Sequence, residues 1–84
     1  MNITTPSQAH LGRAIRRLRE QRSLSIEALA AAADMHPTYL SGIERGHNNP
    51  TWTKLSGLAK ALNTTVAAIA TEAEAEANNP KALG

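Results

Sequence analysis

The side chains in this 84-residue sequence that could do catalytic or metal chemistry are few and scattered. His10, His36 and His47 lie far apart, and no carboxylate accompanies them at the spacing of metal ligands, so no metal site is predicted. Ser41 has no adjacent histidine to activate it as a nucleophile. The absence of cysteine excludes a disulfide, a thiolate zinc site and a cysteine nucleophile. Without a glycine-rich phosphate loop or an acid–base pair, the sequence predicts neither an enzyme nor a cofactor.

A cluster of polar, small and aromatic residues between positions 36 and 45 points instead to binding. If this segment is a helix, its outer face holds His36, Thr38, Tyr39, Ser41, Gly42 and Arg45. The one acidic residue of the segment, Glu44, is near its end. A helix face of this composition suits contact with base edges and phosphates in a DNA major groove.

The charge of the chain is unevenly distributed. Residues 1–63 carry a formal net charge of +4, and residues 64–84 carry −2. A basic body suits a polyanionic partner, although a solvated surface of mixed charge accounts for the same numbers. Five arginines crowd the segment before position 23: Arg13, Arg16, Arg17, Arg19 and Arg22. Alone, such a run is typical of a solvated face; beside a DNA-reading helix, we expect Arg13 or Arg17 near a phosphate.

The elements that must position these side chains are predicted to be helices. Aromatic content is only 2%, and no run alternates as a strand would. The apolar residues expected on inner helix faces are Leu11, Ile15 and Leu18 (helix 8–21); Leu29, Ala30 and Ala33 (26–33); Leu40 and Ile43 (37–46); Trp52, Leu55, Leu58, Ala59 and Leu62 (from 51); and Val66, Ile69 and Ala70 (to about 77). Five such helices with short connections predict a compact all-α domain.

Polar and special residues mark the helix ends. Ser25 is expected to cap the second helix, and Thr64 or Thr65 the fifth. Pro37 suits the first turn of the third helix, where its missing N–H would be unpaired anyway. Gly46 suits a left-handed cap after that helix.

The step from the second helix to the third has the composition of a helix-turn-helix. Two short helices crossing near a right angle need a small residue at their contact, which Ala30 supplies. The turn needs a residue that tolerates unusual backbone angles, and Asp34 can do so. Met35, Leu40 and Ile43 are spaced to anchor the third helix from beneath.

These segments resemble the Xre family, the helix-turn-helix proteins of the Cro and phage-repressor type. The resemblance rests on Ser25-Ile26-Glu27-Ala28-Leu29-Ala30 and on Met35-His36-Pro37-Thr38-Tyr39-Leu40-Ser41-Gly42-Ile43-Glu44-Arg45-Gly46, and it covers about residues 11–70. Residues 39–50 and 55–62 look most like restriction–modification controller proteins. The resemblance implies a compact five-helix domain of the lambda-repressor-like DNA-binding type.

The resemblance also implies roles for individual residues. Contacts to bases or adjacent phosphates are implied for His36, Thr38, Tyr39, Ser41 and Gly42. Contacts to the sugar–phosphate backbone are implied for Ser25, Arg45, His47, Asn48 and Asn49. A partly buried salt bridge between Arg19 and Glu44 is expected to tie the first helix to the third.

The sequence departs from the family pattern at several positions. Relatives usually carry glutamine where this chain has Ile26, and glycine in the turn where it has Asp34. The third helix has no Gln, Asn or Arg at its leading positions, so bidentate readout of adenine or guanine from them is not expected. Specificity is expected to depend on His36, the methyl group of Thr38, Arg45 and DNA shape.

The resulting hypothesis is a sequence-specific transcriptional regulator. It would bind double-stranded DNA as a homodimer on a pseudo-palindromic operator, with half-sites about 34 Å apart. The dimer surface is expected on the fifth helix, at Val66 and Ile69. The alternative is an antitoxin or adaptor module whose main partner is another protein, such as a toxin.

The predicted organisation is a flexible N-terminal arm (1–7), a domain over 8–77 with the helix-turn-helix at 26–45, and a frayed tail (78–84). No signal peptide or membrane span is predicted, so a cytoplasmic, nucleoid-associated protein is expected. Glu72, Glu74 and Glu76 are interpreted as a solvated helix end. They could instead keep the fifth helix away from DNA and leave it for a partner subunit.

Overall fold

The computed structural model describes residues 4–79, and every regular element among them is an α-helix. The helices are α1 (Gln8–Gln21), α2 (Ile26–Ala32), α3 (Pro37–Glu44), α4 (Trp52–Ala61) and α5 (Val66–Ala77). The predicted all-α fold of five helices is therefore confirmed. Two helices end slightly earlier than predicted, α2 at Ala32 and α3 at Glu44.

Each helix is preceded by a polar residue whose side chain accepts a hydrogen bond from one of the free backbone N–H groups of the first turn. The hydroxyl oxygens of Ser25, Thr51 and Thr65 accept hydrogen bonds from the N–H three residues later, at 3.0, 3.2 and 3.0 Å. The cap of α1, Ser7, was not predicted from the sequence. There the Ser7 hydroxyl accepts from the His10 N–H, and Nδ1 of His10 accepts from the Ser7 N–H at 2.9 Å.

A residue in the left-handed backbone conformation lies two positions after the end of each of the first four helices. Gly46 has φ of 78°, as predicted for the cap after α3, and Asp34 has φ of 55° in the turn between α2 and α3. Ser23 and Asn63 adopt the same conformation, with φ of 54° and 55°. Each of the three non-glycine positions accepts a local steric cost of about 1–2 kcal/mol.

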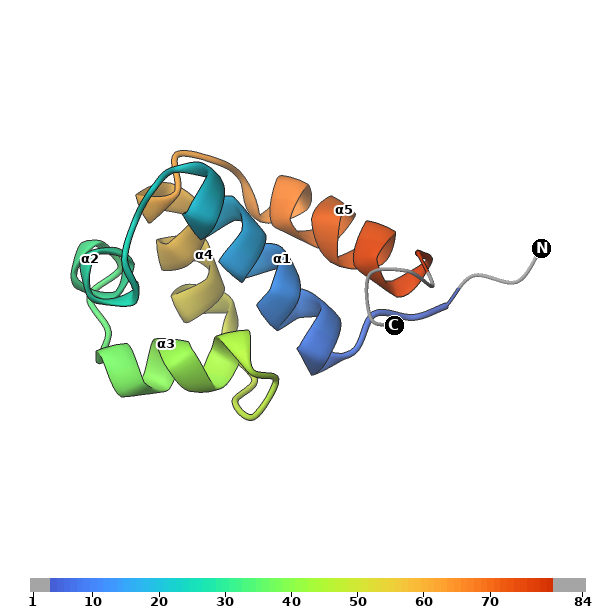
Figure 1. The fold of residues 1–84 in the computed structure, drawn as a ribbon, viewed down its shortest axis with the longest axis horizontal. Helices are drawn as coiled ribbons and strands as arrows, with labels where there is room; N and C mark the ends of the chain where they lie inside the picture. The colour runs from blue at the N-terminus through green and yellow to red at the C-terminus, as the bar shows by residue number, and fades with distance from the viewer. Residues whose placement is uncertain (1–3, 80–84) are drawn as a thin grey trace.

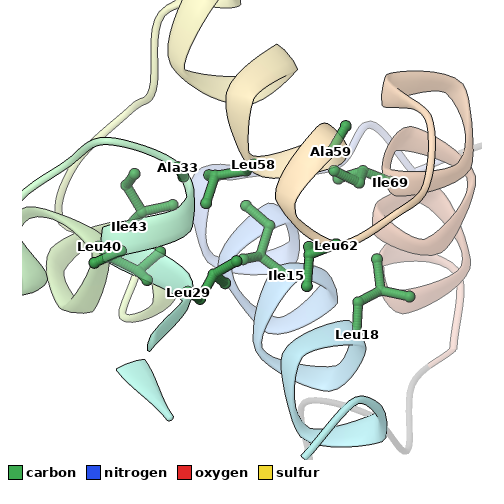
Figure 2. Close-up of a cluster of buried hydrophobic side chains, with 11 residues drawn as sticks. Ile15, Leu18, Leu29, Ala33, Leu40, Ile43, Leu58, Ala59, Leu62 and Ile69 are labelled. Carbon is green, nitrogen blue, oxygen red and sulfur yellow. The ribbon is translucent and has the colours of Figure 1, made fainter. Parts of the chain in front are cut away.

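Side chains from all five helices meet in one core (Figure 2). Its largest fully buried members are Ile15, Leu29, Leu40, Ile43, Leu58, Leu62 and Ile69. Burial of each such side chain stabilises the fold by about 1.5–3 kcal/mol relative to exposure. The core therefore holds both helices of the helix-turn-helix against the rest of the domain.

The longest helix, α1, is packed against α3 and α5, which lie on different sides of it (Figure 1). Helix α2 contacts α3 and α4, and α4 contacts α5. At Gly12 the backbones of α1 and α3 come so close that a Cβ atom there would lie 2.6 Å from the carbonyl oxygen of Glu44. Helix α1 thus supports the C-terminal end of α3 directly.

The prediction that Ile69 forms a dimer surface is wrong, because Ile69 is fully buried within the single chain. Val66 is half-buried and is packed against the same core. Ile69, Ala73 and Glu76 follow the i, i+4, i+7 spacing of one helix face, and all three are buried. This face of α5 is covered by other helices of the same molecule.

The interpretation of the acidic residues of α5 as a solvated helix end is wrong at Glu76, which is only 2% exposed. Its carboxylate forms an ion pair with Arg17 of α1, whose guanidinium also lies 3.9 Å from Glu72. Glu74 is exposed, as expected. The acidic end of α5 therefore helps to join α5 to α1.

The prediction that Trp52 belongs to the core is also wrong, because its side chain is 70% exposed. Its spacing to Leu55 and Ala59 does match one helix face, and Ala59 is buried as predicted. Trp52, however, is the first residue of α4. Periodicity assigns a residue to a face but does not say whether another element covers that end of the helix.

The start and end of the described chain meet. The Thr4 N–H donates to Oδ1 of Asn78 at 3.0 Å, and Nδ2 of Asn78 donates to the Thr4 carbonyl at 3.3 Å. The other parts of the predicted arm and tail, residues 1–3 and 80–84, lie outside the described residues. Within residues 4–79, no helix combines the length and the apolar character needed to cross a membrane.

Candidate DNA interface

Helices α2 and α3 form a helix-turn-helix whose turn is fixed by backbone geometry. Asp34 adopts the left-handed conformation, and the Met35 N–H donates to the Ala30 carbonyl at 2.9 Å. Ala30 is fully buried, as expected of a small residue between crossing helices. Met35 is half-buried against the core beneath α3. Leu40 and Ile43, the other two residues predicted to set this geometry, are fully buried.

The first turn of α3 uses His36 as a cap. Nδ1 of His36 accepts a hydrogen bond from the Thr38 N–H at 3.1 Å, and Pro37 occupies the first helical position. Because Nδ1 is the acceptor, the neutral ring carries its proton on Nε2. His36 is exposed, so it can offer an N–H donor at the leading end of α3.

The six residues assigned to the outer face of α3 differ in exposure. His36, Thr38 and Arg45 are exposed, and Tyr39 and Ser41 are half-buried. Tyr39 is also packed against the core. These five residues form what we call the reading face.

Gly42 is buried, so its assignment to the outer face is wrong. The side chain of Asn48 covers it, and a Cβ atom at this position would lie 2.9 Å from Cγ of Asn48. Nδ2 of Asn48 donates to the Tyr39 carbonyl at 3.3 Å. Glycine at position 42 leaves room for the side chain of Asn48. The hydrogen bond from Asn48 to the Tyr39 carbonyl attaches the loop to α3.

The loop after α3 folds back onto the end of the helix. The backbone N–H groups of His47 and Asn48 both donate to the Gly42 carbonyl, at 2.8 and 3.2 Å. His47 and Asn49 are exposed in this loop, while Asn48 is half-buried. Arg45 and His47 line one cleft beside α1, whereas Asn49 faces a second one, formed with the start of α1 and with α5.

Arg19 and Glu44 form the salt bridge that was predicted between α1 and α3. Nε of Arg19 donates to Oε2 of Glu44 at 2.8 Å, and a second guanidinium nitrogen donates to Oε1 at 3.0 Å. Arg19 also donates to the Leu24 carbonyl at 2.8 Å. The two side chains are only 12% and 5% exposed. The bridge ties α3 to α1 and to the segment before α2.

The hydrogen bond to Glu44 raises the pKa of Arg19 above its usual range, and burial opposes this only in part. Because the pKa of Arg19 is higher in the folded than in the unfolded chain, the protonated guanidinium stabilises the fold. This stabilisation is complete below the unfolded-state pKa and is lost only as pH rises through the folded-state pKa. Both values are strongly alkaline for arginine. The bridge therefore keeps its cation over the whole neutral range.

At the start of α2, Ser25 is exposed, and its hydroxyl oxygen already accepts from the Ala28 N–H. Ile26 is half-buried and is packed against the core, which explains an apolar residue where relatives have glutamine. Glu27 is exposed in the first turn of α2. No role was predicted for this carboxylate, whose negative charge weakens a phosphate contact at the N-terminus of α2.

The arginines of α1 have different surroundings. Nε of Arg16 pairs with Glu20 at 3.3 Å on the exposed surface, and Arg17 pairs with the buried Glu76. Arg13 is exposed, and no carboxylate within residues 4–79 forms an ion pair with it. Of the two arginines expected near phosphate, Arg17 is therefore engaged with α5.

The model of the helix-turn-helix domain family matches residues 10–71. The chain belongs to this family. The family resemblance seen in the sequence is thereby confirmed. The control protein C.SmaI of Serratia marcescens is 44% identical to this helix-turn-helix chain over 52 residues, which cover 62% of each protein. The chain spans less than two thirds of the length of the curated relatives that it matches.

Solved structures of regulators share this fold. The restriction–modification controller protein C.AhdI from Aeromonas hydrophila has a TM-score of 0.73 and 31% identity, covering 74% of this chain and 94% of C.AhdI. The clp gene regulator ClgR from Corynebacterium glutamicum has a TM-score of 0.80 and 32% identity, covering 82% of this chain and 73% of ClgR. The helix-turn-helix geometry of this chain is thus that of known regulatory proteins.

Proposed function

We propose that this chain is a DNA-binding transcriptional regulator that places α3 in the major groove. One observation carries the proposal: Glu44, the sole acidic residue of α3, is buried against Arg19, so the reading face offers polar groups and no carboxylate. Arg45 and His47 lie exposed at the end of that face. The names of C.SmaI and ClgR, a control protein and a gene regulator, support the same role.

The proposed contacts divide into two classes. His36, Thr38, Tyr39 and Ser41 would meet base edges, while Ser25, Arg45, His47, Asn48 and Asn49 would meet sugar and phosphate. Phosphate contacts fix the position of a protein on DNA, whereas base contacts provide sequence information. The role is one of binding without catalysis, metal or cofactor, and it places the protein in the cytoplasm on the nucleoid.

The two contact classes predict different effects of mutation on DNA affinity, measured with a random duplex and with one selected from a random DNA pool. Arg45→Ala should weaken binding to the selected and to a random duplex alike, and the negative slope of log K against log salt should become less steep by about 0.9. Thr38→Ala should weaken only the selected duplex, by about 1–3 kcal/mol. Fluorescence anisotropy titrations at several salt concentrations measure both. A loss confined to the selected duplex in Arg45→Ala would contradict its assignment to phosphate.

The regulator is proposed to act as a homodimer on a pseudo-palindromic operator. With Ile69 inside the monomer core, the feature that supports a dimer is Trp52, a large aromatic side chain 70% exposed at the start of α4. Aromatic residues are enriched at the centres of protein interfaces.

Trp52 is the only tryptophan, so its fluorescence reports on this surface directly. Its emission should shift to shorter wavelength as protein concentration rises and the dimer forms. Trp52→Ala should sediment as a monomer at concentrations where the unaltered chain is dimeric. A chain that stays monomeric at every concentration, also when bound to the selected duplex, would rule out the homodimer.

A further inference from the structure

An open cleft of about 620 Å³ lies where α1 passes the end of α3. Its cationic lining comes from Arg13, Arg16 and Arg17 of α1 and from Arg45 after α3, with His47 beside them. Glu20, Glu44 and Glu76 also line it. The cleft therefore combines two residues of the proposed DNA interface with three arginines of α1, one of which, Arg13, was expected near a phosphate.

Every acidic residue of the cleft already has a cationic partner. Glu44 is bonded to Arg19 at 2.8 and 3.0 Å. Glu20 pairs with Arg16 at 3.3 Å, and Glu76 pairs with Arg17.

Arg13 and Arg45 remain as the uncompensated charges. Neither forms an ion pair with a carboxylate of residues 4–79. Nε of Arg45 donates to the Ser41 carbonyl at 3.3 Å, which holds the base of the guanidinium and leaves its terminal N–H groups for a ligand. With His47 beside them, these two arginines give the cleft an excess of positive charge.

We infer that this cleft binds a phosphate group between Arg13 and Arg45. Guanidinium groups present paired N–H donors that match the oxygens of a phosphate, and they keep their charge at all physiological pH values. The favoured source of the phosphate is the DNA backbone, because Arg45 and His47 belong to both the cleft and the proposed DNA interface. That part of the inference rests on the proposed function. A free phosphorylated compound would use the same chemistry without DNA.

Arg13→Gln tests the inference, and Lys60→Gln is its matched control. Both side chains are exposed, but Lys60 lies on α4 and does not line the cleft. On a random duplex, Arg13→Gln should make the negative slope of log K against log salt less steep by about 0.9, the value for one phosphate contact. Lys60→Gln should leave the slope unchanged. This result identifies the phosphate as that of the DNA backbone.

A second arm uses inorganic phosphate, titrated against chloride at equal ionic strength while the arginine Nε–H signals are followed by NMR. If the DNA slope is unaffected in Arg13→Gln but phosphate shifts the Arg13 and Arg45 signals of the unaltered chain, the cleft takes a free phosphorylated ligand. If the slope is unaffected and phosphate shifts neither signal, the inference is overturned. If the unaltered chain binds no DNA yet phosphate shifts both signals, the proposed function fails and the cleft site stands.

Discussion

Replacing Arg19 with methionine is expected to lower the free energy of unfolding by about 3–5 kcal/mol. The carboxylate of Glu44 is 5% exposed and accepts two hydrogen bonds from Arg19. Without the guanidinium it would be a buried charge with no partner, which costs far more than the bridge itself contributes. A small domain has a total stability of about 5–15 kcal/mol, so Arg19→Met should be largely unfolded under mild denaturing conditions. Urea denaturation followed by circular dichroism measures the change.

Two control variants distinguish the cost of leaving a buried charge unpaired from the cost of losing an ion pair. Arg16→Met breaks the pair with Glu20, whose side chains are 62% and 56% exposed, and should cost less than about 1 kcal/mol. The double variant Arg19→Met/Glu44→Met removes both buried charges and should recover most of the lost stability. Equal costs for Arg16→Met and Arg19→Met would show that the bridge to Glu44 is not a buried structural pair.

Gly12→Ala is expected to destabilise the domain by about 1–3 kcal/mol, although alanine is the better helix former. A Cβ atom at Gly12 would be 2.6 Å from the carbonyl oxygen of Glu44 and 2.8 Å from its carbonyl carbon. These are backbone atoms that cannot rotate away, so α1 and α3 would have to separate. The same separation would shift Arg45, and DNA affinity should fall together with stability.

Gly57→Ala is the matched control for this substitution. Gly57 also lies inside a helix, α4, but its added Cβ atom would meet only the Ala33 carbonyl oxygen at 3.6 Å, an ordinary contact. Here the helix propensity of alanine should dominate and raise stability by up to about 1 kcal/mol. Thermal denaturation compares the two variants. A change of the same sign in both would refute the close approach at Gly12 as the cause.

Features that depend on local chemistry could be predicted from the sequence. The caps at Ser25 and Thr65 follow from hydroxyls placed before apolar periodic segments, and the left-handed residues Asp34 and Gly46 follow from turn chemistry. The Arg19–Glu44 bridge was expected only from the family resemblance, because its partners are 25 positions apart.

Features that depend on which element covers which face could not be predicted. The spacing of Ile69 is the same for a monomer core and for a dimer surface, and only the position of α1 and α4 decides that it is buried. Trp52 has core spacing but lies at an uncovered helix end. Gly42 faces outward on a helical projection, yet Asn48 closes over it from a loop. In each case the deciding contact comes from a distant part of the chain.

If the reading face of α3 recognises base sequence, two duplexes of the same composition must differ in affinity for the chain. One duplex carries the site selected from a random DNA pool by the unaltered chain, and the other carries the same bases in scrambled order. At a single near-physiological salt concentration, the selected duplex is expected to bind at least about 10³-fold more tightly than the scrambled one. Equal affinity for both duplexes would show that α3 contributes no sequence readout.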